Sequence, residues 1–241
     1  DETPRPKTEV KHIVLDDKTT RTLPFYLAME EVVARTFNED CFFTWIVPPT
    51  VIFGRNQVME NEVNADFCTA NGIGMIRRKS GGGCVYADEG NIMLSFITPT
   101  GKRTVEEIFG TYMQRVADVL SEIDGLRGRV HVSGRNDILL DDRKISGNAL
   151  YTTPDMRRTI VHGTLLHSTD IERMVRAITP SHEKLASKGI QSVRQRVMNL
   201  SEATDISIAD LRRHIIAALC DSEAVATQAM IDEATNITNQ K

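Results

Sequence analysis

Cysteine is scarce in this sequence, and its few copies are not arranged for disulfide or metal binding. The 241 residues include four cysteines, Cys41, Cys68, Cys84 and Cys220, and no two of them form a Cys-x-x-Cys pair. Such spacing gives neither a zinc site nor a disulfide framework, so we expect a reducing compartment. The six histidines do not make a metal-binding motif either.

Long apolar runs and a positive net charge are also absent. No apolar run approaches the roughly 18 residues of a membrane span. The net charge of -4 argues against a general nucleic-acid binder, whose footprint is normally basic. We therefore expect neither a membrane nor a nucleic acid among the partners. The expected location is the cytoplasm, or the mitochondrial matrix if the source is a eukaryote.

The sequence does contain an unusual glycine-rich stretch at residues 77–91. Two arginines and a lysine lead directly into Gly81, Gly82 and Gly83. An ordinary turn needs one or two glycines, because each one costs conformational entropy on folding. Three together let backbone N–H groups approach a ligand, and the adjoining basic side chains favour an anion such as phosphate. Composition alone also allows a mobile glycine hairpin with incidental arginines.

This stretch differs from the common nucleotide-binding loops. A Walker loop requires Gly, four residues and then Gly-Lys-Ser/Thr before a helix. The only Gly-Lys pair, Gly101-Lys102, has Phe96 at the position of the first glycine. The dinucleotide fingerprint is excluded because a strand, not a helix, is expected to follow. Apolar runs at 74–76 and 92–97 predict strands on either side, which places the glycines on a loop of a sheet.

Hydrophobic periodicity predicts one α+β domain over residues 1–241, with mixed, largely antiparallel sheets flanked by helices. Residues 1–8 are expected to form a loose arm, and residues 141–143 a hairpin turn. No internal repeat or low-complexity linker divides the chain. Helices are predicted at 23–37, 62–71, 104–123, 171–177, 208–220 and 224–234. Further strands are predicted at 12–16, 42–46, 50–53, 130–132, 138–140, 145–150 and 159–167.

The glycine-rich stretch, read as Arg-Arg-x-Ser-Gly-Gly-Gly-x-Val-Tyr-x-Asp-x-Gly-Asn, resembles the signature of the lipoate–protein ligase family. That family is related in fold to biotin protein ligases and class II synthetases. Blocks at 54–57, 133–137, 143–149, 162–166 and 188–197 also resemble the family's pattern. The resemblance covers roughly residues 10 to 220. One departure is Ala87, because the family commonly has histidine before Asp88.

The resemblance implies an enzyme that uses ATP, Mg²⁺ and lipoate. A lipoate carboxylate would attack the α-phosphate of ATP to form lipoyl-AMP, and a lysine of an acceptor protein would then take the lipoyl group. Lys144 is the implied catalytic residue, because a cation that bridges carbonyl and phosphate oxygens stabilises charge in both steps. Without the resemblance, Lys144 would be interpreted as an exposed hairpin lysine. Asp137 is the implied Mg²⁺ ligand, since magnesium prefers hard oxygen ligands.

Further binding residues follow from the resemblance. Trp45 is interpreted either as a core aromatic or as a wall of an acyl pocket near Val51 and Phe53. His162 either lines that pocket or is a satisfied core histidine. Asp88 is expected to brace the loop, and the Arg194/Arg196 block to be structural or, alternatively, functional. Residues expected to contact the nucleotide or acyl group are Arg55, Arg78, Ser80, Gly81, Gly82, Gly83, Asn91 and Asn136.

The implied partners are apo lipoyl domains of 2-oxoacid dehydrogenase E2 subunits and the glycine-cleavage H protein. Residues after about 220 are too few to form the family's additional C-terminal domain. The chain is therefore expected to use its own loops, to borrow a separate small accessory protein, or to accept preformed lipoyl-adenylate. The rival function is a lipoyl or octanoyl transferase of the same fold, which needs a nucleophilic cysteine beside Lys144. A biotin ligase fits the blocks less well. A non-catalytic lipoate- or adenylate-binding module need not keep Lys144 and Asp137.

Overall fold

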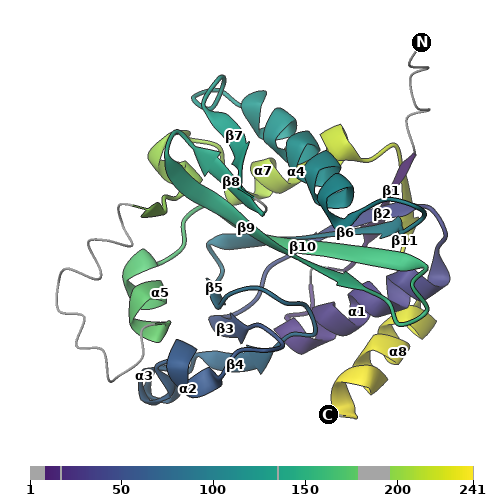
Figure 1. The fold of residues 1–241 in the computed structure, drawn as a ribbon, viewed down its shortest axis with the longest axis horizontal. Coiled ribbons are helices and arrows are strands. Elements are labelled where there is room, and N and C mark those ends of the chain that lie inside the picture. Colours follow the sequence, from purple (N-terminus) through teal and green to yellow (C-terminus); the bar gives the residue numbers. More distant parts are fainter. Residues whose placement is uncertain (1–8, 17, 135, 179–195, 241) are drawn as a thin grey trace.

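A mixed eight-stranded sheet forms the centre of the protein. The computed structural model describes residues 9–240 except 17, 135 and 179–195. The strands are β1 Val10–Val14, β2 Asp40–Trp45, β6 Asn91–Pro99, β7 Val130–Ser133, β8 Asp137–Leu140, β9 Arg143–Thr152, β10 Arg158–Leu166 and β11 Ser222–Val225. Their spatial order is β11-β1-β2-β6-β10-β9-β8-β7 (Figure 1). β1 is parallel to β11 and β2, and every other neighbouring pair is antiparallel.

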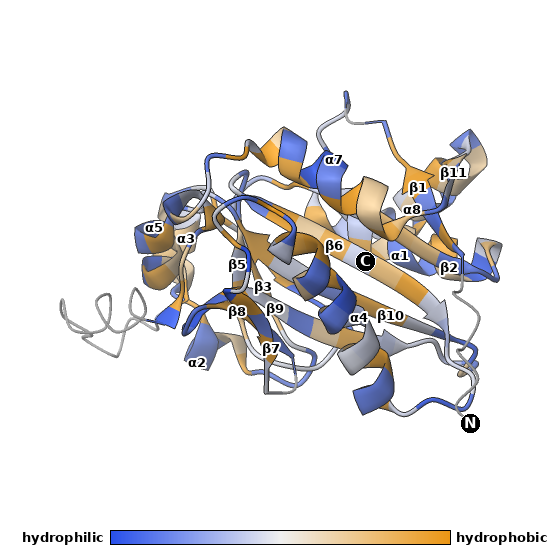
Figure 2. Cartoon of the chain, turned by 90° about the horizontal axis from the view of Figure 1, so that it is seen from above, coloured by the Kyte–Doolittle hydropathy of each residue, from blue (hydrophilic) through white to orange (hydrophobic). Residues whose placement is uncertain are grey.

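Helices cover both faces of this sheet. The main ones are α1 Leu23–Thr36, α4 Val105–Ser121, α7 Ile208–Leu219 and α8 Gln228–Asn239. In β6, Ile92 and Leu94 pack with α4 and α7, whereas Met93 and Ile97 pack with α1 and α8. Because both sets of alternating side chains are buried, β6 is apolar along most of its length, as its colours in Figure 2 show. The predicted α+β architecture is confirmed.

A three-stranded sheet, ordered β4-β3-β5, holds the glycine-rich stretch. Its strands are β3 Thr50–Phe53, β4 Gly74–Arg77 and β5 Val85–Ala87, and three short helices lie near it in Figure 1: α2 Met59–Glu62, α3 Ala65–Ala70 and α5 Ile171–Ala177. β3 is parallel to β4 and antiparallel to β5. The loop at 78–84 therefore links two strands of one sheet, β4 and β5. The predicted strand at 74–76 agrees with β4, but the predicted strand at 92–97 is β6 of the main sheet, and β5 was not predicted.

Local chemistry explains where the longer helices begin. Thr104 caps α4 by accepting from the Glu107 N–H, while the Glu107 side chain accepts from the Thr104 N–H. α1 has Pro24 in its first turn, where the missing N–H costs no helical hydrogen bond. The predicted helices at 23–37, 104–123 and 208–220 are confirmed to within two residues. No helix among the described residues is long and apolar enough to cross a membrane.

Two helix predictions were wrong in detail. The stretch 62–71 is not one helix, because α2 ends at Glu62 and the Asn64 side chain caps α3 by accepting from the Phe67 N–H. The stretch 224–234 begins as strand β11, whose edge pairing with β1 competes with helix formation. Helix α8 begins only after Thr227, whose hydroxyl accepts from the Met230 N–H.

Candidate active site

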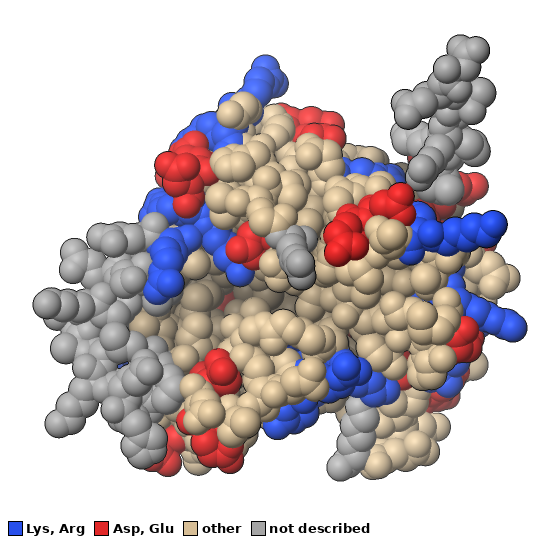
Figure 3. All heavy atoms as spheres, in the orientation of Figure 1, with Lys and Arg blue, Asp and Glu red and all other residues tan. Residues whose placement is uncertain are grey.

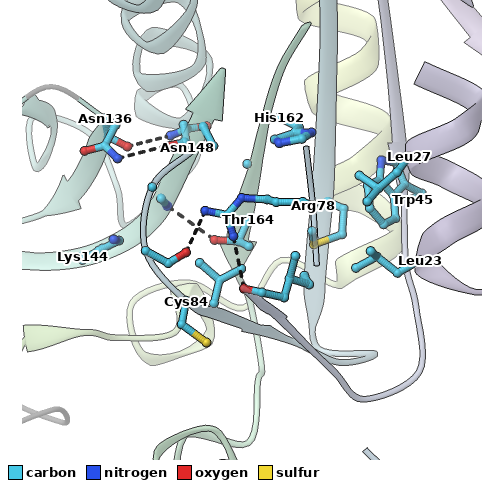
Figure 4. A pocket seen from close by; sticks show the side chains of 18 residues that line it. Leu23, Leu27, Trp45, Arg78, Cys84, Asn136, Lys144, Asn148, His162 and Thr164 are labelled. Atoms are coloured by element: carbon cyan, nitrogen blue, oxygen red, sulfur yellow. Dashed lines mark hydrogen bonds between the residues drawn. The ribbon is translucent and has the colours of Figure 1, made fainter. Parts of the chain in front are cut away.

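A pocket of about 100 Å³ lies between the glycine loop of the small sheet and the strands of the main sheet. Leu23, Leu27 and Trp45 line one end, and Lys144 and Asn136 lie at the other (Figure 4). Helix α1 supplies the two leucines and β2 supplies the tryptophan. The pocket is therefore apolar at one end and polar at the other.

A second, larger pocket of about 500 Å³ adjoins the first. The two share Gly82, Asn136, Asn148 and Ala149 in their linings, and α4 forms part of the wall of the second. The space-filling view shows a hollow on this face, at the level between β9 and β5 (Figure 3). A ligand with an apolar chain and a bulky polar group could occupy both pockets at once, with its junction beside Asn136 and Asn148.

The glycine loop is built around the buried guanidinium of Arg78, which is 6% exposed. Arg78 Nη2 donates to the carbonyl oxygens of Gly81 and Gly83 at 2.6 and 2.7 Å. The C=O and N–H of a trans peptide point in opposite directions. The N–H groups of Gly82 and Cys84 therefore point away from the guanidinium, and no described residue accepts a hydrogen bond from either. Both N–H groups are therefore available to an anion.

Arg78 therefore acts differently from the direct phosphate clamp expected from the sequence. Its Nη1 donates to the Ile52 carbonyl at 3.1 Å and its Nε to Ser80 Oγ at 3.0 Å. No described carboxylate forms an ion pair with it, and burial lowers the pKa of its guanidinium. The structure makes Arg78 the organiser of the loop and leaves its positive charge unneutralised beside the pocket.

Lys144 and Asp137 form an ion pair at the polar end of the first pocket. Lys144 Nζ lies 2.9 Å from Asp137 Oδ1, and the side chains are 37% and 35% exposed. The pair depends on a β-bulge, because Ile138 pairs with Ser146 while Leu139 pairs with Lys144. The extra residue, Ile145, turns Lys144 toward the face that Gly147 also occupies. Strict two-residue alternation would have placed residues 144 and 147 on opposite faces.

Glycines at two positions leave room for these groups. A Cβ on Gly147 would lie 2.8 Å from the Cε and Nζ atoms of Lys144. A Cβ on Gly163 would lie 2.0 Å from Asn148 Oδ1, a buried atom with no hydrogen-bond partner among the described residues. Asn148 Nδ2 donates to the Asn136 carbonyl at 3.1 Å, and Asn136 Nδ2 returns a bond to the Asn148 carbonyl at 3.0 Å. These bonds hold the junction between the two pockets.

His162 lines the first pocket, and both of its ring nitrogens are engaged. Nε2 lies 2.7 Å from Ser80 Oγ, and Nδ1 lies 3.0 Å from Glu30 Oε2. His162 is therefore a hydrogen-bonded histidine in the wall of the first pocket, and its contact with an acyl group stays a prediction. Trp45 likewise is both core and pocket wall, at 1% exposure with its ring stacked on Tyr26. Ser80 is buried behind the loop.

Several predicted contacts lie elsewhere. Asn91 is fully buried, and its side chain bonds the backbone of Tyr86 and Leu165, so its expected role as a ligand contact is replaced by a structural one. Arg55 is exposed and lines neither pocket. Val51 and Phe53 pack in a separate core, because strand alternation turns only Ile52 toward the pocket.

Other predictions are settled or lie outside the described residues. Asp88 braces its loop as expected, since its carboxylate accepts from the N–H groups of Gly90 and Asp170. Ala87 is buried in the core beside α1. Arg194 lies outside the described residues, so its role remains a prediction. Arg196 interacts with another residue, and its role stays a prediction too.

The described residues hold no group of three or more His, Cys, Asp or Glu side chains that could bind a metal ion. Magnesium needs fewer protein ligands than such a group supplies, because it keeps several waters and is held by one or two carboxylates with substrate phosphates. Asp137, which is 35% exposed beside Lys144, fits that requirement. Of the four cysteines, Cys84 alone lines the first pocket, and burial raises the pKa of its thiol to about 12.

Sequence reasoning missed Asn148, which lines both pockets, and the buried polar residues Glu30 and Ser95, which lie outside the linings of the two pockets. The sequence did indicate that Glu30 is unusual. It is an acidic residue three positions after Leu27 and three before Val33, on the apolar stripe of a predicted helix. Ser95 is similarly a hydroxyl within a strand that is otherwise apolar. Asn148 belongs to a block already quoted, but its bond to Asn136 depends on tertiary structure.

Comparisons with known proteins identify the family of this chain. Residues 23–220 match the model of the lipoyl protein ligase A/B catalytic domain. The lipoate-protein ligase LplJ of Bacillus subtilis is 34% identical over 208 residues, which are 85% of this chain and 61% of that protein. Lipoate–protein ligase 1 of Staphylococcus aureus is 34% identical over 211 residues, 86% of this chain and 62% of that protein. The chain thus spans about three-fifths of the length of these relatives.

A solved structure is similar over almost its whole length. It comes from an archaeal lipoylation system of Thermoplasma acidophilum, described as a bi-partite lipoate protein ligase and its E2 lipoyl domain. The TM-score is 0.87 at 26% identity, and the match covers 98% of this chain and 94% of that chain.

Proposed function

This chain belongs to the lipoyl protein ligase A/B catalytic domain family, and on that premise we propose that it activates lipoate with ATP and transfers the lipoyl group to a lysine of a lipoyl domain. The observation that carries the proposal is the position of the Lys144–Asp137 pair. It stands at the polar end of an apolar pocket, where that pocket adjoins a larger one beside the glycine loop.

The first pocket suits the acyl chain. Leu23, Leu27 and Trp45 would surround its apolar part, and the carboxylate would lie toward Lys144. Burying apolar surface favours this orientation by about 25 cal/mol per Å². The buried charge of Arg78, which has no described carboxylate partner, would attract the carboxylate into the pocket.

The second pocket suits the nucleotide. The outward N–H groups of Gly82 and Cys84 would bind phosphate oxygens, as backbone N–H groups do in other anion-binding loops. Lys144 would neutralise charge where the lipoate oxygen forms its bond to the α-phosphorus and pyrophosphate leaves, which gives lipoyl-AMP. Asp137 would hold Mg²⁺ together with the phosphates, and the ion supplies further charge neutralisation when bound.

Transfer requires the same residues. The amine of the acceptor lysine would attack the carbonyl carbon of lipoyl-AMP, forming the amide bond and releasing AMP. Lys144 would stabilise the negative charge that grows on the carbonyl and phosphate oxygens. Loss of one such preorganised contact typically costs about 3–4 kcal/mol, or ~10²–10³ in rate. We propose E2 lipoyl domains as acceptors, with the glycine-cleavage H protein as a second one.

The decisive experiment supplies the purified protein with an apo lipoyl domain, lipoate and Mg-ATP and measures the mass of the acceptor. A lipoyl mass increase that disappears without ATP is expected. Lys144→Ala should fold normally and release pyrophosphate ~10²–10³ times more slowly. An unchanged rate of pyrophosphate release in that variant would remove Lys144 from the site.

A second arm of the experiment supplies preformed lipoyl-AMP in place of lipoate and Mg-ATP. Fast modification from lipoyl-AMP with slow adenylation would support the proposal of a separate small accessory protein that assists the first step. Equal, fast modification from both would show that this domain is sufficient, and the accessory partner would be dropped.

A further inference from the structure

A buried chain of hydrogen bonds runs from the apolar end of the first pocket to the glycine loop. Trp45 Nε1 donates to Ser95 Oγ at 2.8 Å, and the Ser95 hydroxyl donates to Glu30 Oε1 at 2.6 Å. The Glu30 carboxylate lies 3.0 Å from His162 Nδ1, and His162 Nε2 lies 2.7 Å from Ser80 Oγ. None of the roles proposed above uses Glu30, although it is only 2% exposed.

The direction of each bond follows from the chemistry of the groups. A carboxylate only accepts, so the N–H of His162 must be on Nδ1. With a single ring N–H on Nδ1, Nε2 is an acceptor, and the Ser80 hydroxyl donates to it. Ser80 Oγ also accepts a hydrogen bond from Arg78 Nε at 3.0 Å. One protonation pattern thus satisfies every member, which is the condition under which a buried polar network stabilises a single arrangement.

The chain joins three separate parts of the fold. Glu30 is on α1, His162 is on β10 of the main sheet, and Ser80 is on the loop of the small sheet. Gly81, Gly82 and Gly83 have no side chains with which to fix their own position. Ser80 is the residue immediately before them, so its bond to His162 fixes the start of the anion-binding segment to the main sheet.

The order Ser80, His162, Glu30 also resembles a nucleophilic triad. A nucleophile must face the space where a substrate carbon can lie. Ser80 is 1% exposed and lines neither of the two adjoining pockets, and its oxygen already takes part in two hydrogen bonds. The separate cavity that it lines with Glu30 and His162 holds only about 30 Å³, which is room for water and not for a substrate carbonyl. The geometry therefore favours holding the loop over attacking a substrate.

We propose that Glu30 and His162 are positioning residues of the nucleotide site, which act on the bound phosphates only by holding Ser80 and the glycine loop. The inference rests on the proposed function for the identity of the ligand. It implies that breaking the chain at Glu30 weakens nucleotide binding more than acyl binding, although Glu30 lines neither of the two pockets.

The test uses Glu30→Gln, with binding of Mg-ATP and of lipoate each measured by calorimetry in the absence of the other. The new amide would have one acceptor oxygen, whereas the Glu30 carboxylate has two, which contact His162 and Ser95. The variant therefore loses at least one hydrogen bond to a charged carboxylate. Such a bond is worth about 1.5–3 kcal/mol, which corresponds to a roughly 10- to 150-fold rise in the Kd for Mg-ATP. The Kd for lipoate should rise by less than the Kd for Mg-ATP, although His162 also lines the first pocket.

Ser95→Ala is the matched control, because it removes the other donor to Glu30 and leaves the His162–Ser80 bond in place. Its Kd for Mg-ATP should remain within about threefold of the parent. Ser80→Ala breaks the chain at the loop itself and is the second test if Glu30→Gln does not fold. If the hydrogen-bonded residues act as one unit in nucleotide binding, their effects should not add. The double variant Glu30→Gln/Ser80→Ala should then bind Mg-ATP no more weakly than the worse single variant.

The outcomes distinguish a failure of the proposed function from a failure of the positioning role. A parent protein that binds no Mg-ATP would refute the proposed function. A parent that binds Mg-ATP while Glu30→Gln and Ser80→Ala bind it equally well would overturn the positioning role alone. Variants that lose lipoate affinity and keep Mg-ATP affinity would assign the hydrogen-bond chain to the acyl pocket. That result would also overturn the positioning role at the nucleotide site.

Discussion

Gly147→Ala should disable the site with little effect on the fold. The new Cβ would lie 2.8 Å from both Cε and Nζ of Lys144, closer than real Cβ atoms come to other atoms. These atoms are the end of a flexible side chain, so Lys144 can swing away while the backbone keeps its place. Its ion pair with Asp137, now 2.9 Å long, would then be lost.

The expected magnitudes separate stability from activity. The Lys144–Asp137 pair is about one-third exposed, and such surface pairs contribute about 0.2–1 kcal/mol. Replacing glycine in a strand by alanine returns about 0.5–1 kcal/mol, because the unfolded chain loses conformational freedom. The two terms nearly cancel, so the Tm should move by no more than about 2–4 °C. Removing the cation from its position should slow ligation by ~10²–10³.

The assay is lipoylation of an apo lipoyl domain followed by mass spectrometry, with the Tm of each variant measured in parallel. Lys144→Ala supplies the reference loss, and the double variant should be no slower than Lys144→Ala alone, because both changes remove the same group. A Gly147→Ala protein that ligates at the parent rate while Lys144→Ala is inactive would refute the reasoning about the bulge.

Three further outcomes are expected. Gly54→Ala would place a Cβ 2.2 Å from the Gly82 carbonyl oxygen; that backbone atom must move, so Mg-ATP affinity should fall while lipoate affinity is retained, and calorimetry checks both. Gly163→Ala would meet Asn148 Oδ1 at 2.0 Å and nearby backbone; it should lower the free energy of unfolding by about 1–3 kcal/mol, measured by urea denaturation. Burial raises the pKa of the Cys84 thiol from 9.0 to about 12; its contribution to stability should be complete below pH 9 and be lost as the pH rises toward 12, and Cys84→Ser should flatten that decline. The same variant tests the transferase alternative, since ligation within a few fold of the parent and no acyl-enzyme mass exclude a thioester on this cysteine.

Elements with strong local signals were predicted well from the sequence. The periodic apolar residues of α4 and its Thr104–Glu107 capping box are both local, and the predicted helix agrees with the structure to within two residues. β11 carries no comparable signal. It is four residues long and exists because the edge of β1 accepts it, which depends on residues far apart in sequence.

The same distinction applies to the site. Lys144, His162 and the glycine loop were identified by resemblance, and the structure brings them to one pocket. The role of Arg78 could not be read from sequence, because a guanidinium that binds carbonyl oxygens of its own loop looks the same as one that binds phosphate. The pairing of Lys144 with Asp137 depends on a bulge, and a single extra residue reverses the face that alternation would predict.

The parallel pairing of β1 with β11 has a consequence for synthesis on the ribosome. Val10–Val14 emerge early, yet their outer edge is covered only when Ser222–Val225 have been made. At ~5–20 residues per second, roughly 10 to 40 s separate the two events. During that interval the nascent chain presents an open strand edge, which can template pairing with another chain. Slower translation should therefore increase aggregation of this protein, and chaperones that cover nascent strands should reduce it.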